Sequence, residues 1–117
     1  MSSTAGSPIV VVLTTLSADT DATGFARTLV EEKLAACVSL LPPMTSVYRW
    51  KDAIEEAREQ QVLIKTTAER IPALQDRFRS LHPYELPEFI VVKPADVAQR
   101  YATWVGEAVG SIVNRES

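Results

Sequence analysis

The stretch that decides the fold is Tyr48-Arg49-Trp50-Lys51-Asp52-Ala53-Ile54, in the middle of a chain of 117 residues. Its centre, Lys51-Asp52-Ala53, is typical of a short turn. We expect one strand over residues 36–50 and its partner over residues 54–67, so that the two form a long hairpin. Pro42-Pro43 interrupts the first of these strands. Since proline cannot donate a hydrogen bond to a neighbouring strand, we expect a bulge or a sheet edge there.

Five further elements flank the hairpin. Short apolar runs indicate strands, and apolar residues that recur every three or four positions indicate amphipathic helices. The strands are residues 9–13 and 88–92, and the helices are residues 22–34, 71–81 and 97–112. Residues that cap helices precede the first and the last helix, at Asp19-Thr20-Asp21 and at Asp96.

The element order is therefore β-α-β-β-α-β-α. Its first six elements are those of a ferredoxin-like α+β sandwich, in which two helices pack on a four-stranded antiparallel sheet. Here the second and third strands form the long hairpin, and a C-terminal helix is added. We expect a single domain over residues 8–117, preceded by a flexible tail at residues 1–7.

One face of this sheet is apolar and is not covered by the first two helices. Both crossover connections are right-handed, so both helices pack on the same face. The strands at residues 9–13 and 88–92 nevertheless carry apolar side chains on both faces. The third helix or a second subunit must cover the remaining apolar face, and the long hairpin could pair with a neighbour. The sequence therefore predicts a homo-oligomer.

Composition narrows the classes of partner and compartment. The net charge is −3 and no stripe of Lys or Arg is present, which argues against nucleic acid and anionic membranes as partners. No apolar run is long enough to cross a bilayer, and the first residues do not resemble a signal peptide. The single cysteine, Cys37, cannot form an internal disulfide. These features predict a cytoplasmic protein.

A second stretch contains several polar side chains and two prolines within seven residues: His82-Pro83-Tyr84-Glu85-Leu86-Pro87-Glu88. It holds the one histidine of the chain, a phenol, two carboxylates and two prolines, at the point where a helix should end. Because prolines fix the backbone, these polar groups are held at defined angles. The stretch is therefore a candidate site.

Together the motifs resemble the CutA divalent-cation-tolerance family over nearly the whole chain. The blocks that carry the resemblance are Lys33-Leu34-Ala35-Ala36-Cys37-Val38, Tyr48-Arg49-Trp50-Lys51 with Ile54-Glu55, Ile64-Lys65-Thr66, His82-Pro83-Tyr84-Glu85 with Pro87-Glu88, and Tyr101 with Trp104. The resemblance implies a ferredoxin-like fold, a homotrimer and a role in tolerance of copper and other divalent metals. It also implies an architecture similar to that of the PII-like signalling trimers.

The chain departs from the family pattern at two places. Asp52 stands where the family commonly has glycine after the Trp-Lys pair, although Asp enters the left-handed backbone region more easily than most residues. Ala95-Asp96-Val97-Ala98 replaces a segment that often contains glycine before the last helix.

Four residues are candidate metal ligands, for copper or another divalent metal bound weakly. His82 and Cys37 offer an imidazole and a soft thiolate, and Glu85 and Glu59 offer oxygen ligands, as Glu88 also would. No paired spacing such as CxxC or HExxH is present, so ligands must come from distant segments or from different subunits. For Cys37 we favour packing over ligation, because free cysteine is commonly buried. His82 could equally cap the end of its helix.

A second set of residues suits a cleft for a small molecule: Tyr48, Trp50, Lys51, Lys65, Tyr84, Glu88 and Trp104. In this reading the protein is a PII-like sensor whose intersubunit anion site uses Lys65, Lys51 and Tyr84. Packing in the core or at an interface is the favoured role of Tyr48, Trp50 and Trp104. A partly buried Lys65 needs a carboxylate partner or an anion, unless its side chain reaches solvent at the strand end.

Two other roles are weighed against these. Acid–base catalysis by His82, Tyr84 and Glu85 lacks an identifiable nucleophile and base, so we do not expect an enzyme. A rigid trimer could also anchor another protein, whose identity the sequence does not indicate.

Overall fold

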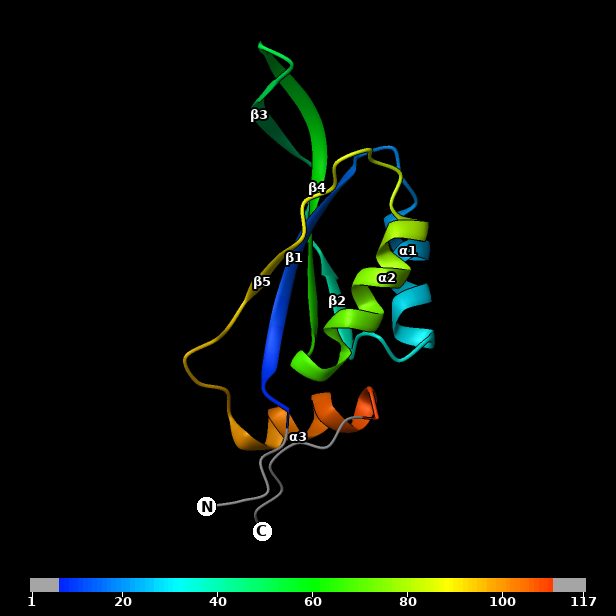
Figure 1. Ribbon diagram of the computed structural model, residues 1–117, viewed down its shortest axis with the longest axis vertical. Helices are drawn as coiled ribbons and strands as arrows, with labels where there is room; N and C mark the ends of the chain where they lie inside the picture. Colours follow the sequence, from blue (N-terminus) through cyan, green and yellow to red (C-terminus); the bar gives the residue numbers. More distant parts are fainter. Residues whose placement is uncertain (1–6, 111–117) are drawn as a thin grey trace.

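The computed structural model describes residues 7–110, and its elements follow the predicted order (Figure 1). Residues 1–6 of the predicted tail lie outside the described residues, as does the predicted end of the last helix at residues 111–112. The elements are β1 (Ile9–Ser17), α1 (Ala22–Glu31), β2 (Cys37–Leu40), β3 (Met44–Trp50), β4 (Ala53–Thr67), the short 3-10 helix η1 (Ala68–Arg70), α2 (Ile71–Leu81), β5 (Ile90–Val92) and α3 (Gln99–Ala108).

The sheet has the strand order β2-β4-β1-β5, and β3 continues beside β4 where β2 has ended. All pairs are antiparallel. The predicted ferredoxin-like sandwich is confirmed, with β2 and β3 together as one interrupted strand. Pro42-Pro43 lies in the gap between them, as expected of residues that cannot complete a ladder.

Several predicted boundaries move. β1 extends to Ser17, because its register with β4 continues for nine residues to the pair Ser17 and Glu59. α1 ends earlier, at Glu31, and Lys33 follows with a φ of 60°. The predicted cap at Asp96 is wrong, because the residue before α3 is Ala98 and the Asp96 carboxylate accepts a hydrogen bond from the amide of Val97 instead.

The hairpin turn has two central residues in the left-handed region. Lys51 and Asp52 have φ values of 49° and 68°. A two-residue connection with positive φ at both positions matches the right-handed twist of the flanking strands. The expectation that Asp52 can take the place of glycine in this turn is confirmed.

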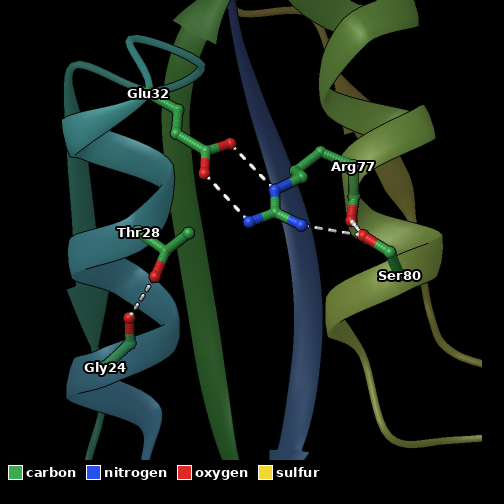
Figure 2. A network of polar contacts seen from close by, with 5 residues as sticks. All are labelled: Gly24, Thr28, Glu32, Arg77 and Ser80. Carbon is green, nitrogen blue, oxygen red and sulfur yellow. Dashed lines mark hydrogen bonds and ion pairs between the residues drawn. The ribbon is translucent and has the colours of Figure 1, made fainter.

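The main core lies between the sheet and the pair of helices α1 and α2, which cover the same face (Figure 1). Val12, Ile64, Leu29 and Leu74 are fully buried in it. Figure 2 shows the outer link between the two helices, where Arg77 of α2 makes two hydrogen bonds of 2.8 and 2.9 Å to the carboxylate just after α1, Glu32.

The opposite face, here called the open face, presents Val11, Leu13, Leu63, Ile90 and Val92. Their register places them on one side of three adjacent strands. Ile90 is 50% exposed and Val92 is 40% exposed. α3 does not cover this face. It closes the end of the sheet, where its buried side chains pack with Ile9 and Ala36.

The hairpin projects beyond the two-layered body. The molecule measures 53 × 26 × 24 Å, and Figure 1 shows β3 and the first half of β4 at one end of its long axis. The apolar side chains of Val47 and Ile54 on this arm are 64% and 62% exposed.

Candidate functional site

A pocket of about 720 Å³ lies where the hairpin leaves the body of the sheet. Its lining comes from the end of β1, from both strands of the hairpin and from the segment between α2 and β5. The lining residues are Thr15, Ser17, Met44, Ser46, Tyr48, Arg49, Trp50, Ala57, Arg58, Glu59, Gln61, Tyr84, Glu85, Leu86 and Glu88.

Strand alternation decides which hairpin side chains enter the pocket. Met44 pairs with Glu59 and Tyr48 pairs with Glu55, so every second residue of the two strands points to the side of the open face. Trp50 shares that side. Arg49 and Arg58 are also lining residues, although their positions alternate with these residues, and the Arg58 guanidinium donates to the hydroxyl of Thr45.

Glu59 and Tyr84 form the polar centre of the pocket. The Tyr84 hydroxyl donates to Oε2 of Glu59 over 2.7 Å, and Glu59 is only 8% exposed. Burial, followed by the bond to this carboxylate, raises the pKa of the Tyr84 phenol well above its ordinary value of 10.0. The phenol is therefore a hydrogen-bond donor at neutral pH.

His82 lies behind this pair, buried, and uses both ring nitrogens. Nε2 is 2.7 Å from the carbonyl oxygen of Thr15, and Nδ1 accepts a 3.1 Å hydrogen bond from the amide of Tyr84. These two bonds assign a neutral ring with its proton on Nε2. Burial lowers the pKa of His82 below 6.5. Its ring also packs against Phe78, at 4.9 Å between centroids.

Gln61 extends the network on the other side of the pocket. Its side-chain amide donates to the carbonyl oxygen of Thr14 over 2.7 Å and to Oε2 of Glu88 over 3.2 Å. The carboxylate of Glu88 is thereby fixed beside the sheet. The sequence analysis did not single out Gln61, which stands two positions after Glu59 and so lies on the same face of β4.

Several predicted residues lie elsewhere. Cys37 pairs with Lys65, which is six positions from Glu59 along β4 and hence about 20 Å away. The Lys65 ammonium donates to the Ser39 hydroxyl over 3.4 Å and has no glutamate beside it among the contacts of the described residues. Of the four predicted metal ligands, Cys37 is therefore not brought together with Glu59 within one chain.

Of the residues predicted for the small-molecule cleft, some line the pocket and others lie elsewhere. Tyr48, Trp50, Tyr84 and Glu88 meet in the pocket, together with the metal candidates Glu59 and Glu85. The Lys51 ammonium is 5.5 Å from the ring of Trp50, near the hairpin turn. Trp104 packs on Tyr101 of α3, with 5.6 Å between ring centroids, and is not part of the pocket.

Within residues 7–110, no three His, Cys, Asp or Glu side chains come together closely enough to hold a metal ion. The predicted intersubunit placement of ligands is not tested by a single chain. No helix in this part of the chain is long and apolar enough to cross a membrane.

A ferredoxin-like sandwich with a projecting hairpin and an acidic, aromatic pocket at its base defines the class of this protein. The chain belongs to the CutA1 divalent ion tolerance protein family, whose model matches residues 10–108. The resemblance stated from the motifs is thereby confirmed.

Individual relatives agree with this assignment. The divalent-cation tolerance protein CutA of Thermus thermophilus is 41% identical over 86% of this chain and 97% of its own length. Its solved structure superposes with a TM-score of 0.81. The human protein CutA is 45% identical over 74% of this chain, which spans about half (49%) of the human protein. The structure from Archaeoglobus fulgidus, 28% identical with a TM-score of 0.81 over 86% of this chain and 98% of its own, is described as a periplasmic divalent cation tolerance protein.

Proposed function

We propose that this chain forms a homotrimer that binds copper or another divalent metal weakly, through ligands from more than one copy, as part of the response to metal ions. The observation that most supports the proposal is the open face, which carries exposed apolar side chains beside a pocket containing three glutamates.

The open face favours self-association. Ile90 and Val92 are exposed although they lie on a sheet whose neighbouring positions are apolar. Contiguous apolar surface of this kind is typical of an interface. A second copy packed on the open face would also explain why α3 does not cover this face. A trimer is the closed assembly that the family resemblance implies, and a heterologous contact that closes forms such a ring.

An intersubunit metal site follows from the position of the glutamates. A divalent ion requires several hard or borderline ligands, which one chain does not gather in its described residues. Glu85 is an exposed lining residue of the pocket, so a neighbouring copy can bring ligands to it. Cys37 lies on the open side of β2 and would supply a soft ligand within the assembly. His82 would have to give up a hydrogen bond to bind a metal, which makes it the weakest of the four candidates.

Sedimentation equilibrium tests the assembly. Wild-type protein should have three times the chain mass of 12.9 kDa. Val92→Asp places a charge on the open face and should reduce the mass. Val30→Asp is the matched control, since Val30 is 41% exposed on α1 and Val92 is 40% exposed. A monomeric wild type, or no effect of Val92→Asp, would contradict the proposed interface.

Calorimetric titration with Cu(II) and Zn(II) tests the metal site. Glu85→Gln should weaken binding about tenfold, whereas Glu69→Gln, an exposed carboxylate beside α2, should not. A wild type that binds neither ion would reject metal binding as the function.

The second candidate function is a trimeric small-molecule sensor. The pocket volume of about 720 Å³ and its aromatic lining are within the range of ligand sites, which favours this alternative. The predicted anion ligands Lys65 and Lys51 do not line the pocket, and the cationic residues among its lining are Arg49 and Arg58. A thermal-shift screen of anions and nucleotides tests this version.

We propose no catalytic activity. A cytoplasmic location also remains a proposal, supported by the free thiol of Cys37. Fractionation of cells that express the native protein would test it.

A further inference from the structure

Three strong hydrogen-bond donors among the lining residues, Gln61, Tyr84 and Arg58, already have partners, and a fourth, Arg49, stands at a position of β3 that alternates with the pocket-facing residues. Gln61 gives its amide protons to the Thr14 carbonyl and to Glu88. The Tyr84 hydroxyl donates its hydrogen bond to Glu59. Arg58 donates to the hydroxyl of Thr45. Around Glu59 and Glu88, a ligand rich in acceptors, such as an anion, would therefore find few free donors.

In the part of the chain that the structure describes, each of the two carboxylates at the centre of the pocket, Glu59 and Glu88, accepts a hydrogen bond at one oxygen and not at the other. Tyr84 bonds to Oε2 of Glu59, and Gln61 bonds to Oε2 of Glu88, while Oε1 of each carboxylate accepts no hydrogen bond from the described residues. The one fully buried side-chain polar atom without a partner in this part of the chain is Thr14 Oγ1. Oε1 of Glu59 is therefore reached by solvent, through the pocket that Glu59 lines.

Aromatic rings stand beside these oxygens. Tyr48, Trp50 and Tyr84 all line the pocket, and the Trp50 ring already attracts one ammonium, that of Lys51, from the turn. Ring faces and carboxylates attract cations together. A metal ion would need more ligands than the two free carboxylate oxygens, whereas an ammonium group needs only acceptors for its N–H bonds.

We infer that this pocket binds a small organic cation with a primary ammonium group, which donates to the free oxygens of Glu59 and Glu88 against the tyrosine and tryptophan rings. The inference deepens the small-molecule function and is independent of metal binding. A primary ammonium is favoured over a quaternary one because only the former supplies N–H donors to a buried carboxylate. The ammonium can come from a free amine or from a lysine of a second copy.

Calorimetric titration of the full-length protein with ethanolamine and putrescine tests the site, with choline and inorganic phosphate as comparison ligands. The primary amines should bind at least about tenfold more tightly than choline or phosphate. Glu59→Gln keeps the shape and an acceptor for Tyr84 but removes the charge, and it should weaken amine binding about tenfold or more. Glu56→Gln is the matched control, because Glu56 lies on the same hairpin and points to the opposite side.

The outcomes separate the possibilities. No amine binding by wild type up to about 10 mM, or equal binding by Glu59→Gln, would overturn the inference. If no amine binds and Glu59→Gln lowers the mass of the assembly, Glu59 acts at an interface between copies and the inferred ligand site is overturned. Amine binding without Cu(II) binding would support this inference while rejecting the metal proposal.

Discussion

The Tyr84 hydroxyl donates to Oε2 of Glu59 across 2.7 Å, and this bond ties the segment after α2 to the strand from which the hairpin projects. The two residues are 25 positions apart in the chain. Because Glu59 is almost fully buried, the hydroxyl compensates part of the cost of burying its carboxylate. The bond therefore stabilises the pocket wall and fixes one oxygen of Glu59.

Removal of this bond should lower stability. Tyr84→Phe leaves Oε2 of Glu59 without its donor, which should decrease the free energy of unfolding by about 1–3 kcal/mol. Urea denaturation followed by circular dichroism measures the change. Tyr101→Phe is the control, since Tyr101 is an exposed ring on α3, and it should have little effect. Equal stability of wild type and Tyr84→Phe would show that the bond is not made in solution.

Tyr84 should also make stability depend on alkaline pH. Its folded pKa is raised above 10.0, so its contribution is fully present below pH 10 and is lost as the pH rises from there towards the folded pKa. The melting temperature of wild type should therefore fall more steeply above pH 10 than that of Tyr84→Phe. Parallel curves for the two proteins would contradict the raised pKa.

His82 should make the stability of the protein depend on acidic pH. Burial lowers its folded pKa, so its contribution is present above 6.5 and is lost as the pH falls from 6.5 through the folded pKa. Protonation of Nδ1 would also remove the acceptor of the Tyr84 amide. We expect the melting temperature of wild type to decrease below pH 6.5, and His82→Gln to flatten this decrease. NMR titration of the single imidazole provides a direct measurement, and a pKa above 6.5 would refute the assignment.

The hairpin turn offers a stabilising substitution. Asp52 has a φ of 68°, a conformation that glycine adopts without strain from a Cβ atom. Asp52→Gly should raise the free energy of unfolding by roughly 0.5 kcal/mol, and Asp52→Val should lower it by about 1 kcal/mol or more, since a β-branched residue is strained there. Chemical denaturation of both variants checks the order, and a destabilised Asp52→Gly would contradict it.

The end of α3 depends on a long-range bond. Arg70 donates from Nε to the carbonyl oxygen of Val109 over 2.8 Å, and Gly110 follows with a φ of 71°. Arg70→Ala should destabilise the protein by about 1–2 kcal/mol, because it leaves a carbonyl at the helix end without this donor. Arg79→Ala is the control, since the contact of Arg79 with Asp76 is exposed. Hydrogen exchange in α3 should increase in Arg70→Ala alone.

The local sequence predicted the elements well, where one physical signal dominates. Helix α2 has the predicted bounds, 71–81, because its apolar spacing ends directly before Pro83. Strand ends were harder to predict. β1 runs past Leu13 through Thr14, Thr15 and Leu16, which are buried although two of them are polar, because pairing with β4 continues there. Pairing partners are not encoded in the composition of a single strand.

The site was predicted in part. The stretch from His82 to Glu88 does supply pocket residues, but His82 itself lies behind the wall with both nitrogens bonded. Lys65 and Cys37 were grouped with the glutamates by chemistry, whereas the register separates them by about 20 Å. Gln61 was missed because a neutral amide between Gln60 and Val62 gives no functional signal until its two acceptors are known.

By itself the sequence determined the order of the elements, the hairpin, the family and the apolar character of both sheet faces, since these depend on hydrophobic periodicity and on backbone restrictions of single residues. Tertiary structure decided which side chains share the pocket and what state they are in. The bond between Tyr84 and Glu59, the neutral ring of His82 and the separation of Lys65 from the glutamates arise from strand register and burial, which act between residues far apart in the chain.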